Sequence, residues 1–123
     1  MLTPLRLLYV EDNPIVREVT HDLLMQNQRD IVALSTAEDA LEEFNRRPFD
    51  IVITDVSLPA MSGLDLARQI HAKDPQIPII IASGYLIDLS SKTWGPNVRA
   101  IIKPFDSEQI DDLIEQLCVA GKS

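Results

Sequence analysis

Five short apolar runs, separated by longer amphipathic stretches, constrain the fold of this chain more than any other feature. The runs are rich in leucine or β-branched residues and cover residues 5–10, 31–35, 50–54, 78–82 and 99–102. Such nearly continuous apolarity is typical of strands that are buried on both faces, as in a parallel sheet covered by helices. Because crossovers between parallel strands are right-handed, the alternation predicts an α/β fold, a (βα)5 three-layer sandwich.

The stretches between the apolar runs carry the signals that begin helices. Asn13-Pro14 is suited to the N-cap and first position of a helix that follows the first run. Ser35-Thr36-Ala37-Glu38 has the pattern of a capping box, Ser62 is the expected cap of a third helix, and Asp106 precedes a fourth. Apolar residues recur at helical spacing behind each signal, so we predict an amphipathic helix at each place.

The stretch 86–97 has the weakest pattern of the chain. Serine and threonine are frequent in it and are indifferent helix formers, and Gly95-Pro96 would end a helix. We expect one short, poorly packed helix or a loop there. Trp94 is interpreted as a packing anchor for this segment rather than as a binding residue.

Length and charge narrow the class of protein. With 123 residues, and without a repeat or linker, the chain is expected to form one domain over 1–123 with no output domain. A formal net charge of −8 argues against nucleic acid or a membrane as a direct partner. Cys118 is the single cysteine, which excludes an intrachain disulfide, and no signal peptide or membrane-spanning run is apparent, so we expect a cytoplasmic protein.

Polar residues follow four of the apolar runs directly. Glu11-Asp12 follows the first run, Asp55 the third, Ser83 the fourth and Lys103 the fifth. Because the carboxyl ends of parallel strands meet at one edge of a sheet, where open α/β folds bind their ligands, we expect these side chains to lie together. Three carboxylates, a hydroxyl and a lysine describe a site that binds a metal ion and takes up phosphate.

The three acids form an unfavourable group unless a cation is present. Carboxylates brought within a few ångströms of one another repel by about 1–4 kcal/mol per pair at a wet surface. Hard oxygen ligands with no histidine or cysteine nearby favour Mg²⁺. Taken singly, Asp12 could merely cap the first helix and Asp55 could merely begin a turn. His21 and His71 fall within helical patterns and are interpreted as surface residues.

These motifs, in this order and near this spacing, resemble those of the receiver domain of two-component response regulators. The resemblance covers essentially the whole chain and includes the turn 55–63 and the sequence Lys103-Pro104-Phe105. It implies a doubly wound, flavodoxin-like parallel sheet with strand order 2-1-3-4-5. It also implies that Asp55 accepts a phosphoryl group from a histidine kinase or phosphotransfer protein, and that the chain catalyses only its own phosphorylation and dephosphorylation.

The resemblance further assigns roles to the other polar residues. The implied magnesium ligands are Asp12, Asp55 and the backbone carbonyl of Ser57, with Glu11 assisting. Ser83 and Lys103 would contact the phosphoryl oxygens, and the peptide bond between Lys103 and Pro104 would be cis. The sequence Ala82-Ser83-Gly84-Tyr85 also resembles receivers attached to hybrid sensor kinases.

One position departs from the family pattern. Ala100 stands where members usually carry a tyrosine or phenylalanine that responds to phosphorylation. We therefore expect the segment 84–97, strand 99–102 and the last helix to carry the signal to an unknown downstream protein. The alternative is a pseudo-receiver that acts as a constitutive interaction module without phosphorylation. A flavodoxin-like cofactor binder is disfavoured, because Glu11-Asp12 would repel phosphate after the first strand.

Overall fold

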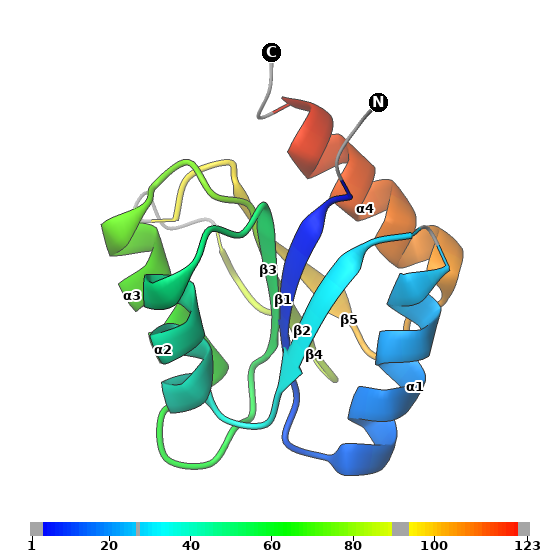
Figure 1. Ribbon diagram of the computed structural model, residues 1–123, viewed down its shortest axis with the longest axis horizontal. Coiled ribbons are helices and arrows are strands. Elements are labelled where there is room, and N and C mark those ends of the chain that lie inside the picture. Colours follow the sequence, from blue (N-terminus) through cyan, green and yellow to red (C-terminus); the bar gives the residue numbers. More distant parts are fainter. Residues whose placement is uncertain (1–3, 27, 90–93, 121–123) are drawn as a thin grey trace.

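A parallel sheet forms the centre of the molecule (Figure 1). The computed structural model describes residues 4–26, 28–89 and 94–120. Its strands are β1 (Arg6–Val10), β2 (Asp30–Leu34), β3 (Ile51–Asp55), β4 (Ile79–Ser83) and β5 (Val98–Ile102). They form one five-stranded sheet in the order β2-β1-β3-β4-β5, and every pairing is parallel. The predicted fold class and strand order are confirmed, and each predicted strand lies within a residue or so of its observed bounds.

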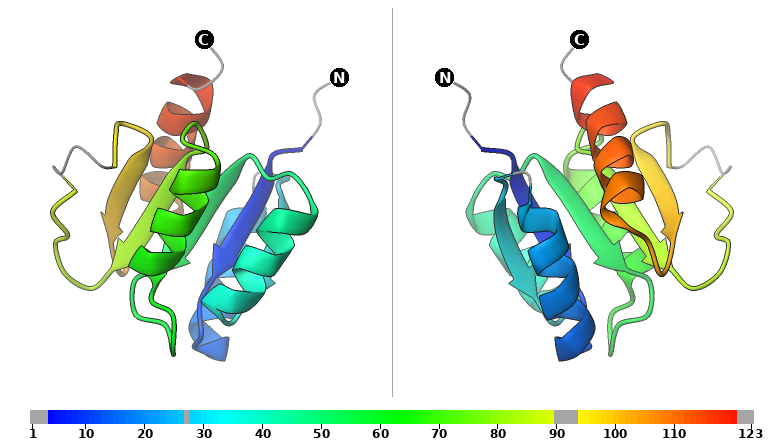
Figure 2. Two further views of the ribbon diagram at one scale, coloured as in Figure 1. Left: turned by 90° about the vertical axis from the view of Figure 1, so that its left-hand side faces the viewer. Right: turned by 90° about the vertical axis from the view of Figure 1, so that its right-hand side faces the viewer.

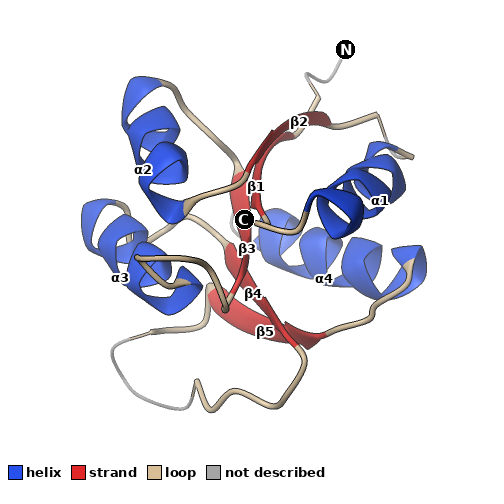
Figure 3. Cartoon of the chain, turned by 90° about the horizontal axis from the view of Figure 1, so that it is seen from below, coloured by secondary structure: helices blue, strands red, loops and turns tan. Residues whose placement is uncertain are grey.

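Helices cover both faces of the sheet. Their bounds are α1 (Pro14–Met25), α2 (Ala37–Arg46), α3 (Gly63–Lys73) and α4 (Ser107–Ala120). Figure 3 looks along the sheet and shows α1 and α4 on one face and α2 and α3 on the other. No helix in the described part of the chain is long and apolar enough to cross a membrane.

The sheet contributes to two hydrophobic cores, one on each face. Leu8, Val10 and Val52 face the core under α2 and α3, whereas Leu7 and Ile53 face the core under α1 and α4. Every residue of β3 and β4 is buried, as expected for central strands of a three-layer fold. The strand ends that carry the polar residues are therefore held by a sheet packed on both sides.

All strands end at the same edge of the sheet. Figure 2 shows the arrowheads pointing to the lower edge, while both chain termini lie at the upper one. The loops after β1, β3 and β5 consequently meet below the sheet, where the sequence predicted the site.

Local capping signals begin the helices, with one correction. The side chain of Asn13 accepts hydrogen bonds from the amides of Ile15 (2.9 Å) and Val16 (3.1 Å), as predicted. The capping box assigned to Ser35 was wrong by one residue. Thr36 is the N-cap of α2, and its hydroxyl accepts from the amide of Asp39 at 3.1 Å.

The side chain of Glu38 explains this shift. Its Oε2 accepts a hydrogen bond from the backbone amide of Met61 at 3.3 Å, in the loop that precedes α3. The carboxylate therefore links α2 to that loop and does not return to Ser35. A tertiary contact has replaced the local contact on which the capping-box prediction depended.

The connection from β4 to β5 contains no helix among its described residues, 84–89 and 94–97. Residues 90–93 lie outside the described residues, so the predicted choice between a short helix and a loop is answered only for the flanking parts. Trp94 is buried and packs against the ring of His71, with the ring centroids 6.2 Å apart. It is a packing anchor, as predicted. His21 and His71, which were predicted at the surface, are both half-buried.

Candidate functional site

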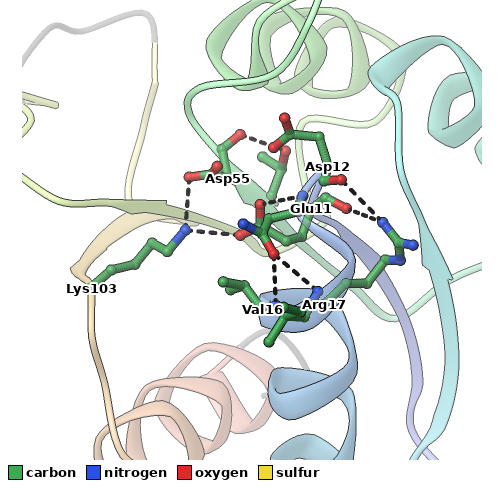
Figure 4. A network of polar contacts seen from close by, with 9 residues as sticks. Glu11, Asp12, Val16, Arg17, Asp55 and Lys103 are labelled. Atoms are coloured by element: carbon green, nitrogen blue, oxygen red, sulfur yellow. Dashed lines mark hydrogen bonds and ion pairs between the residues drawn. The ribbon is translucent and has the colours of Figure 1, made fainter.

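The loops after β1 and β3 bring the three predicted acids together. One carboxylate oxygen from each of Glu11, Asp12 and Asp55 lies within 4.8 Å of the others, and Figure 4 shows the three side chains close together. Glu11 and Asp55 are only 2% and 7% exposed, whereas Asp12 is exposed. The cluster therefore combines two buried carboxylates with a third that is exposed to solvent.

Lys103 reaches the same cluster from the end of β5. Its Nζ donates a hydrogen bond to Glu11 Oε1 at 2.8 Å and lies 3.4 Å from Asp55 Oδ1. Burial alone would lower the pKa of Lys103, but the hydrogen bond to Glu11 and the charge of Asp55 outweigh burial and raise it above 10.5. The ammonium group is therefore charged at neutral pH and joins two acids that would otherwise repel each other.

A network of hydrogen bonds fixes the loop between β1 and α1. Glu11 Oε2 accepts from the backbone amide of Asn13 at 3.2 Å. The guanidinium group of Arg17 donates to the backbone oxygens of Glu11 (2.8 Å) and Asp12 (3.4 Å), and Figure 4 shows it on the side of the loop away from Lys103. Arg17 could not be identified from the sequence, because contacts with backbone carbonyls leave no pattern of residue types.

The turn after β3 is held close to the start of α3. Thr54 Oγ1 donates to the backbone oxygen of Asp55 at 3.0 Å, and the amide of Gly63 donates to the oxygen of Val56 at 3.0 Å. A Cβ atom at Gly63 would overlap the carbonyl oxygen of Asp55, so only glycine fits there. Ser57 lies in the exposed part of this turn, two residues beyond Asp55.

Ser83 ends β4 in a fully buried position. Its Oγ accepts a hydrogen bond from the amide of Tyr85 at 3.2 Å, and the hydroxyl has one hydrogen of its own to donate. The backbone oxygen of Ser83 accepts from the amide of Lys103 at 2.7 Å, which ties the two strand ends together. The peptide bond between Lys103 and Pro104 is cis, as the resemblance implied.

The donor set of the acid cluster fits a hard divalent cation. It offers carboxylate oxygens only, from residues that lie within reach of one ion, and Mg²⁺ binds through one or two carboxylates together with water and phosphate oxygens. Asp12 is the acid best placed to meet a hydrated ion, because it is exposed while Glu11 is engaged by Lys103.

An apolar groove of about 390 Å³ adjoins the acid cluster. It runs between α1 and the start of the loop after β5, and its lining residues are Ile15, Val16, Val19, Thr20, Leu23, Lys103, Pro104 and Phe105. Ile15 and Val19 are 74% and 62% exposed, although both are large and apolar. Lys103 belongs to the groove and to the acid cluster at once.

Comparison with known proteins supplies the family. A sequence model described as response regulator receiver domain matches residues 7–115. The chain belongs to this family. This receiver domain is 35% identical over 116 residues to the sensor protein TorS of Escherichia coli (strain K12), covering 92% of the chain and 13% of TorS. It is 31% identical over 111 residues to the response regulator protein FleR of Pseudomonas aeruginosa, covering 89% of the chain and 24% of FleR.

The receiver domain thus corresponds to a minor part of each of these longer relatives. Among solved structures, it superposes on the signal receiver domain of an HD domain-containing protein from Pseudomonas fluorescens Pf-5 with a TM-score of 0.86. The two are 22% identical, and the match covers 98% of each chain. The fold is therefore shared over the whole length.

Proposed function

We propose that this receiver domain takes a phosphoryl group on Asp55, with Mg²⁺, from a histidine kinase or phosphotransfer protein. The observation that carries the proposal is the position of Asp55 between an acid cluster and an ammonium group. Its carboxylate lies within 4.8 Å of carboxylate oxygens of Glu11 and Asp12 and 3.4 Å from Lys103 Nζ. Glu11 accepts hydrogen bonds from Lys103 and the Asn13 amide, and the exposed Asp12 is the acid best placed to meet a hydrated ion. We therefore assign Asp55 as the nucleophile.

The proposed step is an in-line phosphoryl transfer. A carboxylate oxygen of Asp55 attacks the phosphorus of a phosphohistidine, the new O–P bond forms as the N–P bond breaks, and the imidazole keeps the electron pair. A bound Mg²⁺ would neutralise part of the charge on the phosphoryl oxygens. Lys103, 3.4 Å from Asp55, would pair with another of these oxygens, and the Ser83 hydroxyl, at the end of the neighbouring strand β4, would donate to a third. Hydrolysis of the resulting acyl phosphate would return the free carboxylate.

The apolar groove beside Lys103 supports a protein as the phosphoryl donor. A small donor needs only the acid cluster, whereas a protein must also be held against the surface. The exposed side chains of Ile15 and Val19 on α1, with Phe105 opposite, offer an apolar contact next to the nucleophile. We therefore propose that the donor protein docks over this groove.

We further propose that phosphorylation changes the affinity for a downstream protein. Tyr85, Leu86 and Ile102 are 62%, 83% and 46% exposed, near the carboxyl ends of β4 and β5. Ala100 is exposed as well and has no ring that could turn inward. The response is therefore assigned to displacement of the segment 84–97, of which residues 90–93 lie outside the described residues. The pseudo-receiver alternative would leave this surface in one state.

The acceptor assignment is tested by mass. The protein is incubated with Mg²⁺ and a small acyl-phosphate donor, and we expect the intact chain to gain one phosphoryl group. Asp55→Asn keeps the shape of the side chain and removes the nucleophile, so this variant should gain none. Asp112→Asn, at an exposed position of α4, is the matched control and should label like the wild type. Labelling of Asp55→Asn would mean that another acid is the acceptor, and an unlabelled wild type would favour the pseudo-receiver.

A further inference from the structure

Arg17 is hydrogen-bonded to the backbone of two of the three acids, Glu11 and Asp12. Its guanidinium group lies 2.8 Å from the carbonyl oxygen of Glu11 and 3.4 Å from that of Asp12. The side chain of Glu11 has further partners in Lys103 and the Asn13 amide. For Asp12, the contact with Arg17 is the one hydrogen bond assigned in the described structure, and it is made by the backbone.

The position of Arg17 is not explained by the stability of α1. Arg17 lies in the first turn and a half of this helix, and its amide donates to the oxygen of the N-cap Asn13. The amino end of a helix carries a partial positive charge, so a cation there is locally unfavourable. The first turn of α1 also contains no acid that could offset it. The favourable contacts of Arg17 are therefore those with the carbonyl oxygens of the β1–α1 loop.

We propose that Arg17 is a positioning residue, which fixes the Asp12 carboxylate for a divalent cation by holding the two carbonyl oxygens of the β1–α1 loop. The inference rests on the proposed function of the acid cluster. An exposed carboxylate binds a hydrated ion well only when its backbone is already fixed, because ordering the loop would otherwise be part of the binding equilibrium. Residues that orient metal ligands from outside typically change metal affinity by about 10–100-fold when they are lost.

Charge and position predict opposite results for the loss of Arg17. If the guanidinium acts only as a nearby positive charge, removing it relieves repulsion and Mg²⁺ binds more tightly. If it positions Asp12, removing it frees the loop and Mg²⁺ binds more weakly. Lys103 provides the comparison, because its ammonium contacts the acids themselves and none of the loop carbonyls in the described structure.

The test is the Mg²⁺ dissociation constant of Arg17→Met, measured by titrating backbone amide chemical shifts near the acid cluster. We expect binding about tenfold weaker than in the wild type, whereas Lys103→Met should bind more tightly. Arg17→Lys keeps the charge and one donor, so its affinity should lie between those of the wild type and Arg17→Met. Arg46→Met, which removes an exposed arginine paired with Glu43 on α2, should bind like the wild type.

The signals are taken from folded protein only, with thermal melts in chelator recorded for each variant, so a loss of stability is separated from a loss of affinity. An Arg17→Met variant that binds Mg²⁺ as tightly as the wild type, or more tightly, would overturn the positioning role. A wild type that does not respond to Mg²⁺ would instead refute the proposed function, whatever the variants do.

Discussion

The ion pair between Lys103 and the acid cluster allows a quantitative test. Lys103→Met keeps an unbranched apolar side chain, one atom shorter, and removes the charge that joins Glu11 Oε1 (2.8 Å) to Asp55 Oδ1 (3.4 Å). Glu11 has a side chain only 3% exposed, so its carboxylate would keep the amide of Asn13 but lose its cationic partner. We expect the metal-free variant to be less stable than the wild type at neutral pH.

The magnitude follows from the attraction that the variant loses. Opposite unit charges at the 3.4 Å between Lys103 Nζ and Asp55 Oδ1 attract by about 1 kcal/mol at the dielectric constant of water and by about 5 kcal/mol at an effective value of 20. The side chain of Lys103 is 28% exposed, which places the pair between these limits. We therefore expect a loss of about 2 kcal/mol in the free energy of unfolding, and a fall of about 6–8 °C in Tm for a domain of this size.

The assay is thermal unfolding of both proteins, first in chelator and then with saturating Mg²⁺. The cation replaces the missing charge and binds the variant more tightly, so the difference in Tm should narrow with Mg²⁺. Lys73→Met, at an exposed position at the end of α3, is the control and should change Tm little.

The pH dependence gives a second check on Lys103. Its pKa is raised above 10.5 in the folded state, so its contribution is complete below that pH and is lost as the pH rises through the folded pKa. The difference between wild type and variant should therefore disappear at alkaline pH. A variant with wild-type stability in chelator, or with a deficit that Mg²⁺ does not change, would refute the role of Lys103 as the counter-charge.

Two further results are expected. Val19→Asp places a charge in the apolar groove, so it should slow phosphorylation by a protein donor, a histidine kinase or phosphotransfer protein that acts on the wild type, by about tenfold. Losing one apolar contact and burying a charge costs at least about 1.4 kcal/mol of binding free energy. Phosphorylation by a small donor should be unchanged, and equal slowing of both reactions would show that the groove does not bind the protein donor. Hydrogen exchange with and without a phosphoryl mimic on Asp55 should show altered protection in 84–89 and 94–97, because these described residues belong to no helix or strand. Changes confined to the acid-cluster loops would favour the pseudo-receiver.

The sheet and the polar edge could be predicted because they follow from local patterns. Buried parallel strands require continuous apolar runs, and the residues that follow such runs must gather where the strands end. The positions of Glu11, Asp12, Asp55 and Lys103 directly after apolar runs are therefore enough to predict that they lie together. The distances between the site residues also depend on the strand order, because β3, which carries Asp55, lies between β1 and β4.

The features that were missed depend on tertiary contacts. The cap of α2 moved from Ser35 to Thr36 because Glu38 binds the amide of Met61, far away in the chain. Arg17 was missed because its acceptors are backbone oxygens, which every residue has. The apolar groove was missed because Ile15 and Val19 fit the helical pattern expected of buried residues, yet they point to solvent. Periodicity identifies an apolar face but does not say what covers it.

The distance along the chain between the partners of the site bears on how the protein folds. Lys103 and Glu11 are hydrogen-bonded although they are 92 positions apart, and the strand pairs of the sheet are all parallel, so none is a hairpin. Contacts of this kind form late, after the entropy of closing long loops has been overcome. A nascent chain that lacks β5 would present clustered acids without their lysine. The site that the proposed function requires is therefore assembled only when β5 joins the sheet.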